Sequence, residues 1–189
     1  MLAFAAPMAK AAPVTFSAIL NGASEAPPNP SAGTGTAFVI FDLSLHTMQV
    51  TVNFAGLTGN TTAAHIHCCT TAPNAGNVGI ASQIASFGGF PLGVTSGSYV
   101  DFFDLTLASS FNPAFITANG GSAGSAEAAL FAGMQAQRSY FNIHSNVAGG
   151  GEIRGFLQQV QQVPEPASLA LFALGLAGLA AVRRRSSPT

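Results

Sequence analysis

Charged side chains are scarce in this chain of 189 residues. Only 7% of the residues are charged, and residues 1–182 carry three basic against seven acidic side chains, because the other three basic residues are Arg183, Arg184 and Arg185. A nucleic-acid interface needs a basic patch, so we expect no nucleic acid as a partner. Coiled coils and acidic disordered tails need dense charge, and the composition excludes both.

Tryptophan is absent and tyrosine occurs only twice, so a carbohydrate-stacking platform would depend on the 15 Phe, most of which we expect in the core. The sequence also lacks G-x-S-x-G, a P-loop, a dinucleotide fingerprint and H-E-x-x-H. These absences favour a non-catalytic protein over an enzyme of a common class.

Short β-branched and aromatic runs, divided by Gly, Pro and Asn, fill the chain from about residue 14 to residue 160. This pattern predicts strands and turns. The seven expected strands are 14–20, 36–43, 48–54, 63–67, 99–107, 139–144 and 152–158. They predict an all-β fold. Within that class we expect either a Greek-key β-sandwich, of the immunoglobulin or Cu/Zn superoxide dismutase type, or a partly closed barrel.

One segment departs from the strand pattern. Residues 125–137 are rich in helix formers and place Ala126, Leu130, Gly133 and Met134 on one stripe, so we expect one short helix across an end of the domain. The stretches 70–91 and 109–124 are rich in small and turn-forming residues and are expected to be long loops. The run 48–54 alternates, which predicts that Met48, Val50, Val52 and Phe54 share a face.

The C-terminal segment contains an apolar run, 167–182, between Pro164-Glu165-Pro166 and Arg183-Arg184-Arg185. Sixteen helical residues span roughly 24 Å, less than the ~30 Å of a bilayer core. We expect a short transmembrane helix over 167–182 with its arginines in the cytoplasm, which places residues 1–163 on the other side of the membrane.

This C-terminal arrangement resembles the PEP-CTERM sorting signal of Gram-negative bacteria, over residues 161–189. The resemblance implies export and then processing by an exosortase, a membrane-embedded cysteine transpeptidase, so that an inner-membrane-anchored precursor reaches the cell surface or the extracellular space. Because such sorting follows export, residues 1–12, with their A-x-A patterns, are expected to be the remnant of a secretory signal peptide.

Residues 13–160 resemble a CHRD domain. The resemblance rests on F-S-A-I-L-N-G-A-S-E-A-P-P at 16–28, A-A-H-I-H at 63–67, F-D-L-T at 103–106, Y-F-N-I-H at 140–144 and G-G-E-I-R-G-F-L at 150–157. It implies a β-sandwich in a secreted or surface protein with no established catalytic activity. The chain departs from the family at Cys68-Cys69, where Gly is usual, and at Ala148-Gly149, where Phe-Pro is common.

His65 and His67 are two residues apart on an expected strand, so both imidazoles project from one face and can chelate one metal ion. With His144 and the thiols of Cys68 and Cys69, they form a candidate site for copper or zinc. The structural alternative is that the three histidines hydrogen-bond to backbone carbonyls or to Glu152 and order one end of the sheet.

Cys68 and Cys69 can form a vicinal disulfide, ligate a metal or remain thiols. A stabilising disulfide is the least favoured of the three, because adjacent cysteines are too close for ordinary disulfide geometry. Glu152 and Arg154 share a strand face, which allows an ion pair or second-shell contacts to a histidine.

Two functional hypotheses follow. The first is an exported surface or extracellular-matrix protein, without catalytic activity, that contributes to adhesion or biofilm assembly among exopolysaccharides or other surface proteins. The second is a metal-binding or redox protein that holds copper or zinc at the His-x-His site.

Overall fold

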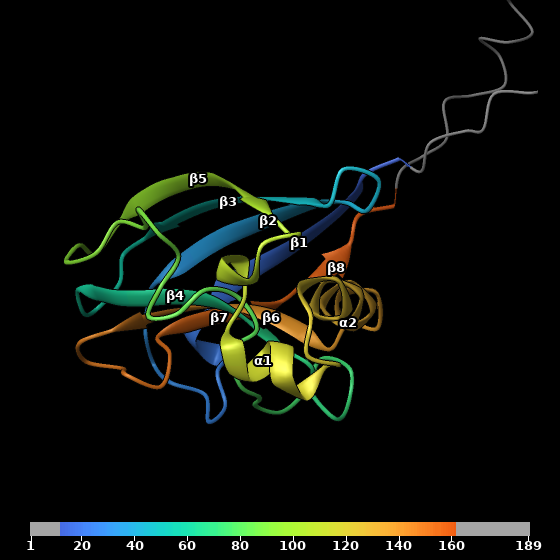
Figure 1. Ribbon diagram of the computed structural model, residues 1–189. Coiled ribbons are helices and arrows are strands. Elements are labelled where there is room, and N and C mark those ends of the chain that lie inside the picture. The colour runs from blue at the N-terminus through green and yellow to red at the C-terminus, as the bar shows by residue number, and fades with distance from the viewer. Residues whose placement is uncertain (1–11, 162–189) are drawn as a thin grey trace, which may run out of the picture.

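The computed structural model describes residues 12–161 of the chain (Figure 1). The strands of this range are β1 (Val14–Asn21), β2 (Thr34–Asp42), β3 (Thr47–Ala55), β4 (Thr61–Cys68), β5 (Gly97–Asp104), β6 (Ser139–Ser145), β7 (Ile153–Phe156) and β8 (Gln158–Gln159). Its helices are α1 (Pro113–Ala118) and α2 (Ala123–Gln135), and short 3₁₀ turns lie at Gly22–Ser24 and Ala108–Ser110. The expected all-β fold is confirmed.

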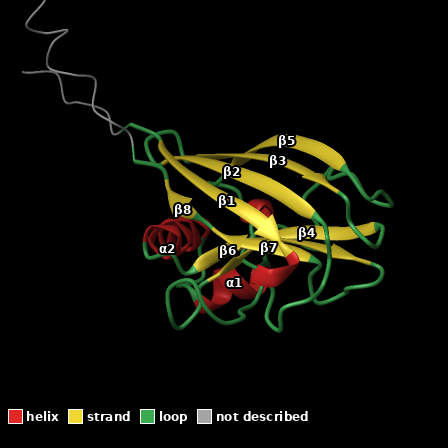
Figure 2. Ribbon diagram, turned by 180° about the vertical axis from the view of Figure 1, so that it is seen from behind, coloured by secondary structure: helices red, strands yellow, loops and turns green. Residues whose placement is uncertain are grey.

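The strands form one antiparallel sheet in the order β4-β6-β7-β1-β2-β3-β5, with β8 paired to β1. The sheet curls on itself, so that β1, β2, β3 and β5 lie in one layer and β4, β6 and β7 in the other (Figures 1 and 2). The two layers of the expected sandwich are therefore halves of a single sheet. They are joined where Asn21 of β1 pairs with Arg154 of β7.

The hydrophobic core lies between the two layers. The side chains of Met48, Val50 and Val52 have no exposed surface and that of Phe54 is only 4% exposed, which confirms the shared face expected from the alternating sequence. On β4 the apolar side chain of Ile66, between two histidines, belongs to this core. Because neighbouring residues of a strand point to opposite faces, the core position of Ile66 places those histidines on the outer face of their layer.

Helix α2 confirms the expected helix, shifted by two residues toward the N-terminus. Ser122 caps it, and a capping box with Ser125 satisfies the first backbone amides. Its apolar stripe is buried against the ends of β4, β6 and β8.

The stretch 109–124 was wrongly expected to be a loop throughout. It contains α1, which begins after Asn112, whose side chain accepts a hydrogen bond from the Ala114 amide, and has Pro113 in its first turn. An Asn-Pro pair is a helix-start signal. The surrounding Gly, Ser and Asn residues obscured that signal in a helix of only six residues.

The long loop after β4 covers the free edge of that strand. The amides of Ala81 and Ser82 donate to the Ile66 carbonyl, and the Phe87 amide donates to the Ala64 carbonyl. Edge strands covered in this way do not pair with other chains. The covering loop also carries backbone carbonyls over the outer face of β4.

Among residues 12–161, no helix is long and apolar enough to cross a membrane. The transmembrane helix expected over 167–182, the sorting signal and residues 1–11 of the expected signal-peptide remnant lie outside the described residues.

Candidate metal centre

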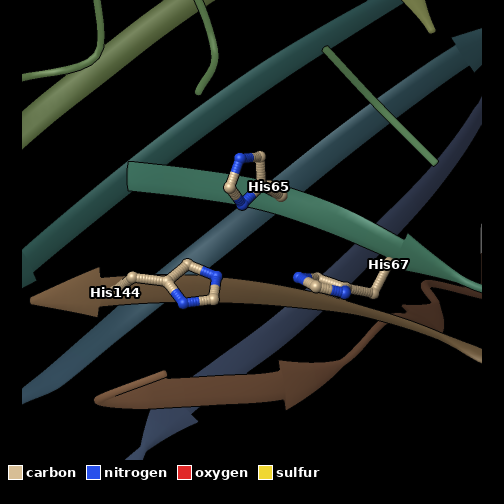
Figure 3. Close-up of side chains that lie close together, drawn as sticks. All are labelled: His65, His67 and His144. Atoms are coloured by element: carbon tan, nitrogen blue, oxygen red, sulfur yellow. The ribbon is translucent and has the colours of Figure 1, made fainter. Parts of the chain in front are cut away.

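Three histidines from two adjacent strands face one another on the outer side of the β4-β6-β7 layer. In the register of β4 and β6, His65 lies opposite Asn142, His67 opposite Tyr140, and His144 opposite Ala63. Figure 3 shows the rings of His65 and His67 on β4 turned toward that of His144 on β6. Their ring centroids are 5.2 to 5.8 Å apart.

Each imidazole is held by a backbone carbonyl from a covering loop. His65 Nε2 lies 2.6 Å from the Ala85 oxygen, and His67 Nδ1 lies 2.8 Å from the Val78 oxygen. His144 Nδ1 lies 3.0 Å from the oxygen of Gly149. A carbonyl oxygen can only accept, so in each ring this nitrogen carries the hydrogen and the other one bears a lone pair.

The three remaining ring nitrogens are His65 Nδ1, His67 Nε2 and His144 Nε2. All three are buried and have no hydrogen-bond partner among the described residues. The three histidines each offer a ligand atom within 4.8 Å of the others. Metal-ligating histidines usually donate their second ring N–H to a carbonyl or carboxylate, and the same pattern is present here three times.

Burial keeps these imidazoles neutral. Desolvation lowers the pKa of His65 and of His67 to about 4, partly opposed by their hydrogen bonds to Ala85 and Val78, and it lowers the pKa of His144 as well. Neutral imidazole is the form that binds metals, so at neutral pH no proton has to be displaced from the cluster.

Tyr140 and Arg154 support this face from the side. The Tyr140 ring stacks on that of His67, with ring centres 4.7 Å apart, and the Arg154 guanidinium lies over the Tyr140 ring, 4.7 Å from its centre. Arg154 also donates hydrogen bonds to the Gly76 carbonyl and to Asn77 Oδ1. Arg154 thus fixes the loop just before Val78, whose carbonyl oxygen accepts the hydrogen bond from His67.

Glu152, the other predicted second-shell residue, is engaged elsewhere. Its carboxylate accepts hydrogen bonds from Ser31 Oγ at 2.6 Å and from the amides of Thr58 and Gly59. Among the described residues, none of its hydrogen bonds reaches an imidazole. Glu152 therefore orders two loops beside the layer.

Comparisons with known proteins identify both the folded domain and the C-terminal segment. A CHRD domain model matches residues 16–157, and a model of the PEP-CTERM protein-sorting motif matches residues 162–185. The chain belongs to the CHRD domain family. No curated protein and no solved structure matches the chain. The sorting motif indicates an exported protein that is anchored transiently in the membrane and processed by an exosortase.

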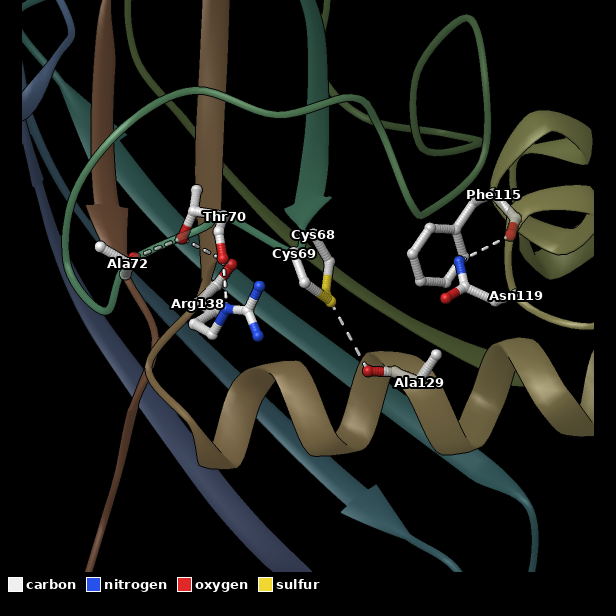
Figure 4. Close-up of a disulfide and its surroundings, with 8 residues drawn as sticks. All are labelled: Cys68, Cys69, Thr70, Ala72, Phe115, Asn119, Ala129 and Arg138. Carbon is white, nitrogen blue, oxygen red and sulfur yellow. Dashed lines mark hydrogen bonds between the residues drawn. A yellow bond between two sulfur atoms is a disulfide. The ribbon is translucent and has the colours of Figure 1, made fainter.

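The cysteines of this CHRD domain are joined to each other. Cys68 and Cys69 form a disulfide, the outcome least favoured by the sequence, so neither sulfur is a free thiolate ligand. The disulfide packs against α2, where Cys69 Sγ lies 3.6 Å from the Ala129 oxygen (Figure 4). An added Cβ at Gly133 would lie 2.3 Å from Cys68 Sγ, so only glycine allows the helix to approach this closely.

Sequence reasoning missed one polar residue of the outer face, Asn142. Alternation along β6 places it on the same face as His144, and this signal was available from the sequence. Glu25 also lies near this face, where its Oε2 is 3.7 Å from Arg154 Nε. Burial raises the pKa of Glu25 to about 7, although the nearby Arg154 charge opposes this shift.

Proposed function

We propose that the CHRD domain of this exported protein binds one divalent transition-metal ion, copper or zinc, through His65, His67 and His144. The observation that carries the proposal is the convergence of three buried ring nitrogens that have no partner in the described protein. The function proposed is metal binding outside the cytoplasm, without catalytic turnover.

A purely structural role accounts for only one nitrogen of each ring. The hydrogen bonds to Ala85, Val78 and Gly149 would order the sheet and its covering loops in either case. Leaving the second nitrogen of each ring buried and unpaired costs about 1–3 kcal/mol per group. One ion coordinated by all three nitrogens removes these penalties together.

The donor set selects for a borderline metal. Imidazole suits zinc and copper, whereas calcium and magnesium prefer oxygen ligands. At a site of given nitrogen donors, copper(II) binds more tightly than zinc(II). The disulfide withholds thiolates from the site, which reduces its preference for copper(I).

Metal titration of the purified full chain tests this function. We expect one copper(II) or zinc(II) per chain, and we expect His65→Ala/His67→Ala to weaken binding at least about 100-fold, because two of three ligands are removed. His46→Gln is the matched control, since His46 lies in the turn between β2 and β3, outside the cluster. Equal affinity of the double variant and the wild type would refute the site.

We further propose that the sorting motif delivers this metal-binding domain to the cell surface or the extracellular matrix. The support is the match of the PEP-CTERM model. Replacing Pro164-Glu165-Pro166 by three alanines should cause the protein to accumulate in the membrane fraction instead of reaching the surface. Cell fractionation with surface proteolysis measures this, and an unchanged distribution would contradict the proposal.

A further inference from the structure

Within residues 12–161, five buried polar atoms without a hydrogen-bond partner lie at the outer face of the β4-β6-β7 layer. Three are the ring nitrogens of the histidine cluster, and the other two are Asn142 Oδ1 and Glu25 Oε1. Buried polar groups without partners are rare in folded proteins, so five at one face require a common explanation. A metal ion alone satisfies only the three nitrogens.

Asn142 occupies the centre of this face. It lies opposite His65 on one side and opposite Arg154 on the other, and it is two residues from His144 on the same strand. Residues directly opposite one another in a sheet have Cβ atoms about 4.5–5.5 Å apart. Asn142 is 2% exposed, so its Oδ1 is shielded from solvent on the face that carries the cluster.

Glu25 approaches Asn142 over the backbone of Gly151. A Cβ added at Gly151 would lie 2.6 Å from Asn142 Oδ1 and 2.7 Å from Glu25 Oε1. Asn142 Nδ2 would lie closer still, at 2.4 Å, so the amide of Asn142 and the Glu25 carboxylate both lie close to the Gly151 backbone, where a side chain at position 151 would overlap them. Gly151 also has a φ of 132°, which disfavours any other residue.

We propose that Asn142 and Glu25 hold the fourth ligand of the metal, a water molecule that small anions can displace. This inference rests on the proposed metal-binding function. Three protein ligands leave one position of a tetrahedral ion open. A water that coordinates through its oxygen keeps two O–H donors, one for Asn142 Oδ1 and one for Glu25 Oε1. One ion and one water thus provide partners for all five atoms.

In this arrangement the fourth ligand of the metal can exchange with small anions from solution. Asn142 Oδ1 and Glu25 Oε1 are acceptors, so they stabilise water and disfavour an anion such as azide, which cannot donate a hydrogen bond. Removing an acceptor should therefore make azide bind more tightly, and adding a negative charge should make it bind more weakly.

Azide titration of the copper(II)-loaded full chain, followed by its visible absorption, tests the inference. We expect azide to change the spectrum of the wild type. Asn142→Leu should bind azide about tenfold more tightly, the equivalent of losing one charge-assisted hydrogen bond to the water. Asn142→Asp should bind azide more weakly than the wild type. Glu127→Gln, at a buried carboxylate of α2 that pairs with His46, is the control and should leave azide affinity unchanged.

The possible results separate the two proposals. A wild type that binds no copper refutes the metal-binding function. A wild type that binds copper but shows no spectral response to azide refutes the exchangeable ligand alone, as does an equal azide affinity in both Asn142 variants and the wild type. If Asn142→Leu does not fold, the azide affinity of Asn142→Asp relative to Glu127→Gln decides the question.

Discussion

At the scale of single residues, the four histidines of the chain illustrate how surroundings decide the chemistry of one side chain. His46 lies in a turn, its side chain is 54% exposed, and its Nδ1 pairs with Glu127 at 2.8 Å. No local pattern of the sequence indicates this pair, because Glu127 lies 81 residues away on α2. His65 and His67 are instead buried and His144 is half-buried, and all three have fixed tautomers, which suits them for coordination.

The buried histidines predict a loss of stability in acid. The pKa of His65 and His67 falls from 6.5 in the unfolded chain to about 4 in the folded protein, so the unfolded state binds more protons between these values. The free energy of unfolding of the metal-free protein should therefore fall as the pH drops from 6.5 to 4. Each histidine contributes up to about 1.4 kcal/mol per pH unit.

Urea denaturation of the chelator-treated full chain at several pH values measures this effect. Glu25 opposes it, because its pKa is raised from 4.5 to about 7, so between these pH values the folded state binds more protons than the unfolded state and gains stability as the pH falls. The comparison is therefore with His65→Gln/His67→Gln, which keeps Glu25 and should show a shallower pH dependence. Identical slopes in the two proteins would contradict the burial of neutral imidazoles.

At the scale of elements, β4 serves the core and the candidate site at once. Ile66 packs inward, while its two neighbours, His65 and His67, belong to the cluster on the outer face. At the end of the strand the disulfide packs against α2. The strand could be predicted from its sequence. The loop that covers it could be predicted only as a loop, because the carbonyls of Val78 and Ala85 reach the histidines through tertiary hydrogen bonds.

The packing of α2 on this disulfide predicts that Gly133→Ala destabilises the protein. Alanine favours a helix over glycine by about 1 kcal/mol, but the new methyl group would overlap both sulfurs, at 2.3 and 2.4 Å. We expect a net loss of about 1–3 kcal/mol from overpacking. Gly124→Ala, on the same helix, is the control and should be neutral or stabilising, because outside the adjoining chain and helix backbone no described atom lies within 4 Å of the added Cβ. Thermal unfolding distinguishes the two variants, and a stabilised Gly133→Ala would contradict the close packing.

At the scale of the whole molecule, curling of the sheet brings its functional parts together. β4 and β6 pair directly, although β5 and both helices separate them in the sequence. The start of β1 also pairs with β8, at Phe16 and Gln159, so the described chain begins and ends on the same side of the domain (Figure 1). The sorting motif follows directly after that point in the sequence.

Metal binding across β4 and β6 should stabilise the entire domain. A ligand bound only by the folded state adds about 2.7 kcal/mol of stability at a concentration of 100 times its Kd. Copper(II) or zinc(II) should therefore raise the midpoint of thermal unfolding of the full chain, and a chelator should reverse the rise. His65→Ala/His67→Ala should not respond. A wild-type midpoint that is unchanged by either metal would argue against the site.

Local patterns in the sequence were sufficient for strands β1 to β6, helix α2, the family and the sorting motif, because alternation, helix periodicity and short motifs are properties of neighbouring residues. The one strand expected over 152–158 is instead divided into β7, which pairs chiefly with β6, and β8, which pairs with β1. The same alternation placed His65 and His67 on one face. Tertiary structure decided what no local pattern encodes. It set the pairing that brings His144 beside them, the loop carbonyls that fix the three tautomers, and the bond between Cys68 and Cys69. It also set the burial that leaves Asn142 Oδ1 and Glu25 Oε1 without a hydrogen-bond partner among the described residues. These features depend on contacts between residues distant in the chain, and they exist only once the sheet has curled.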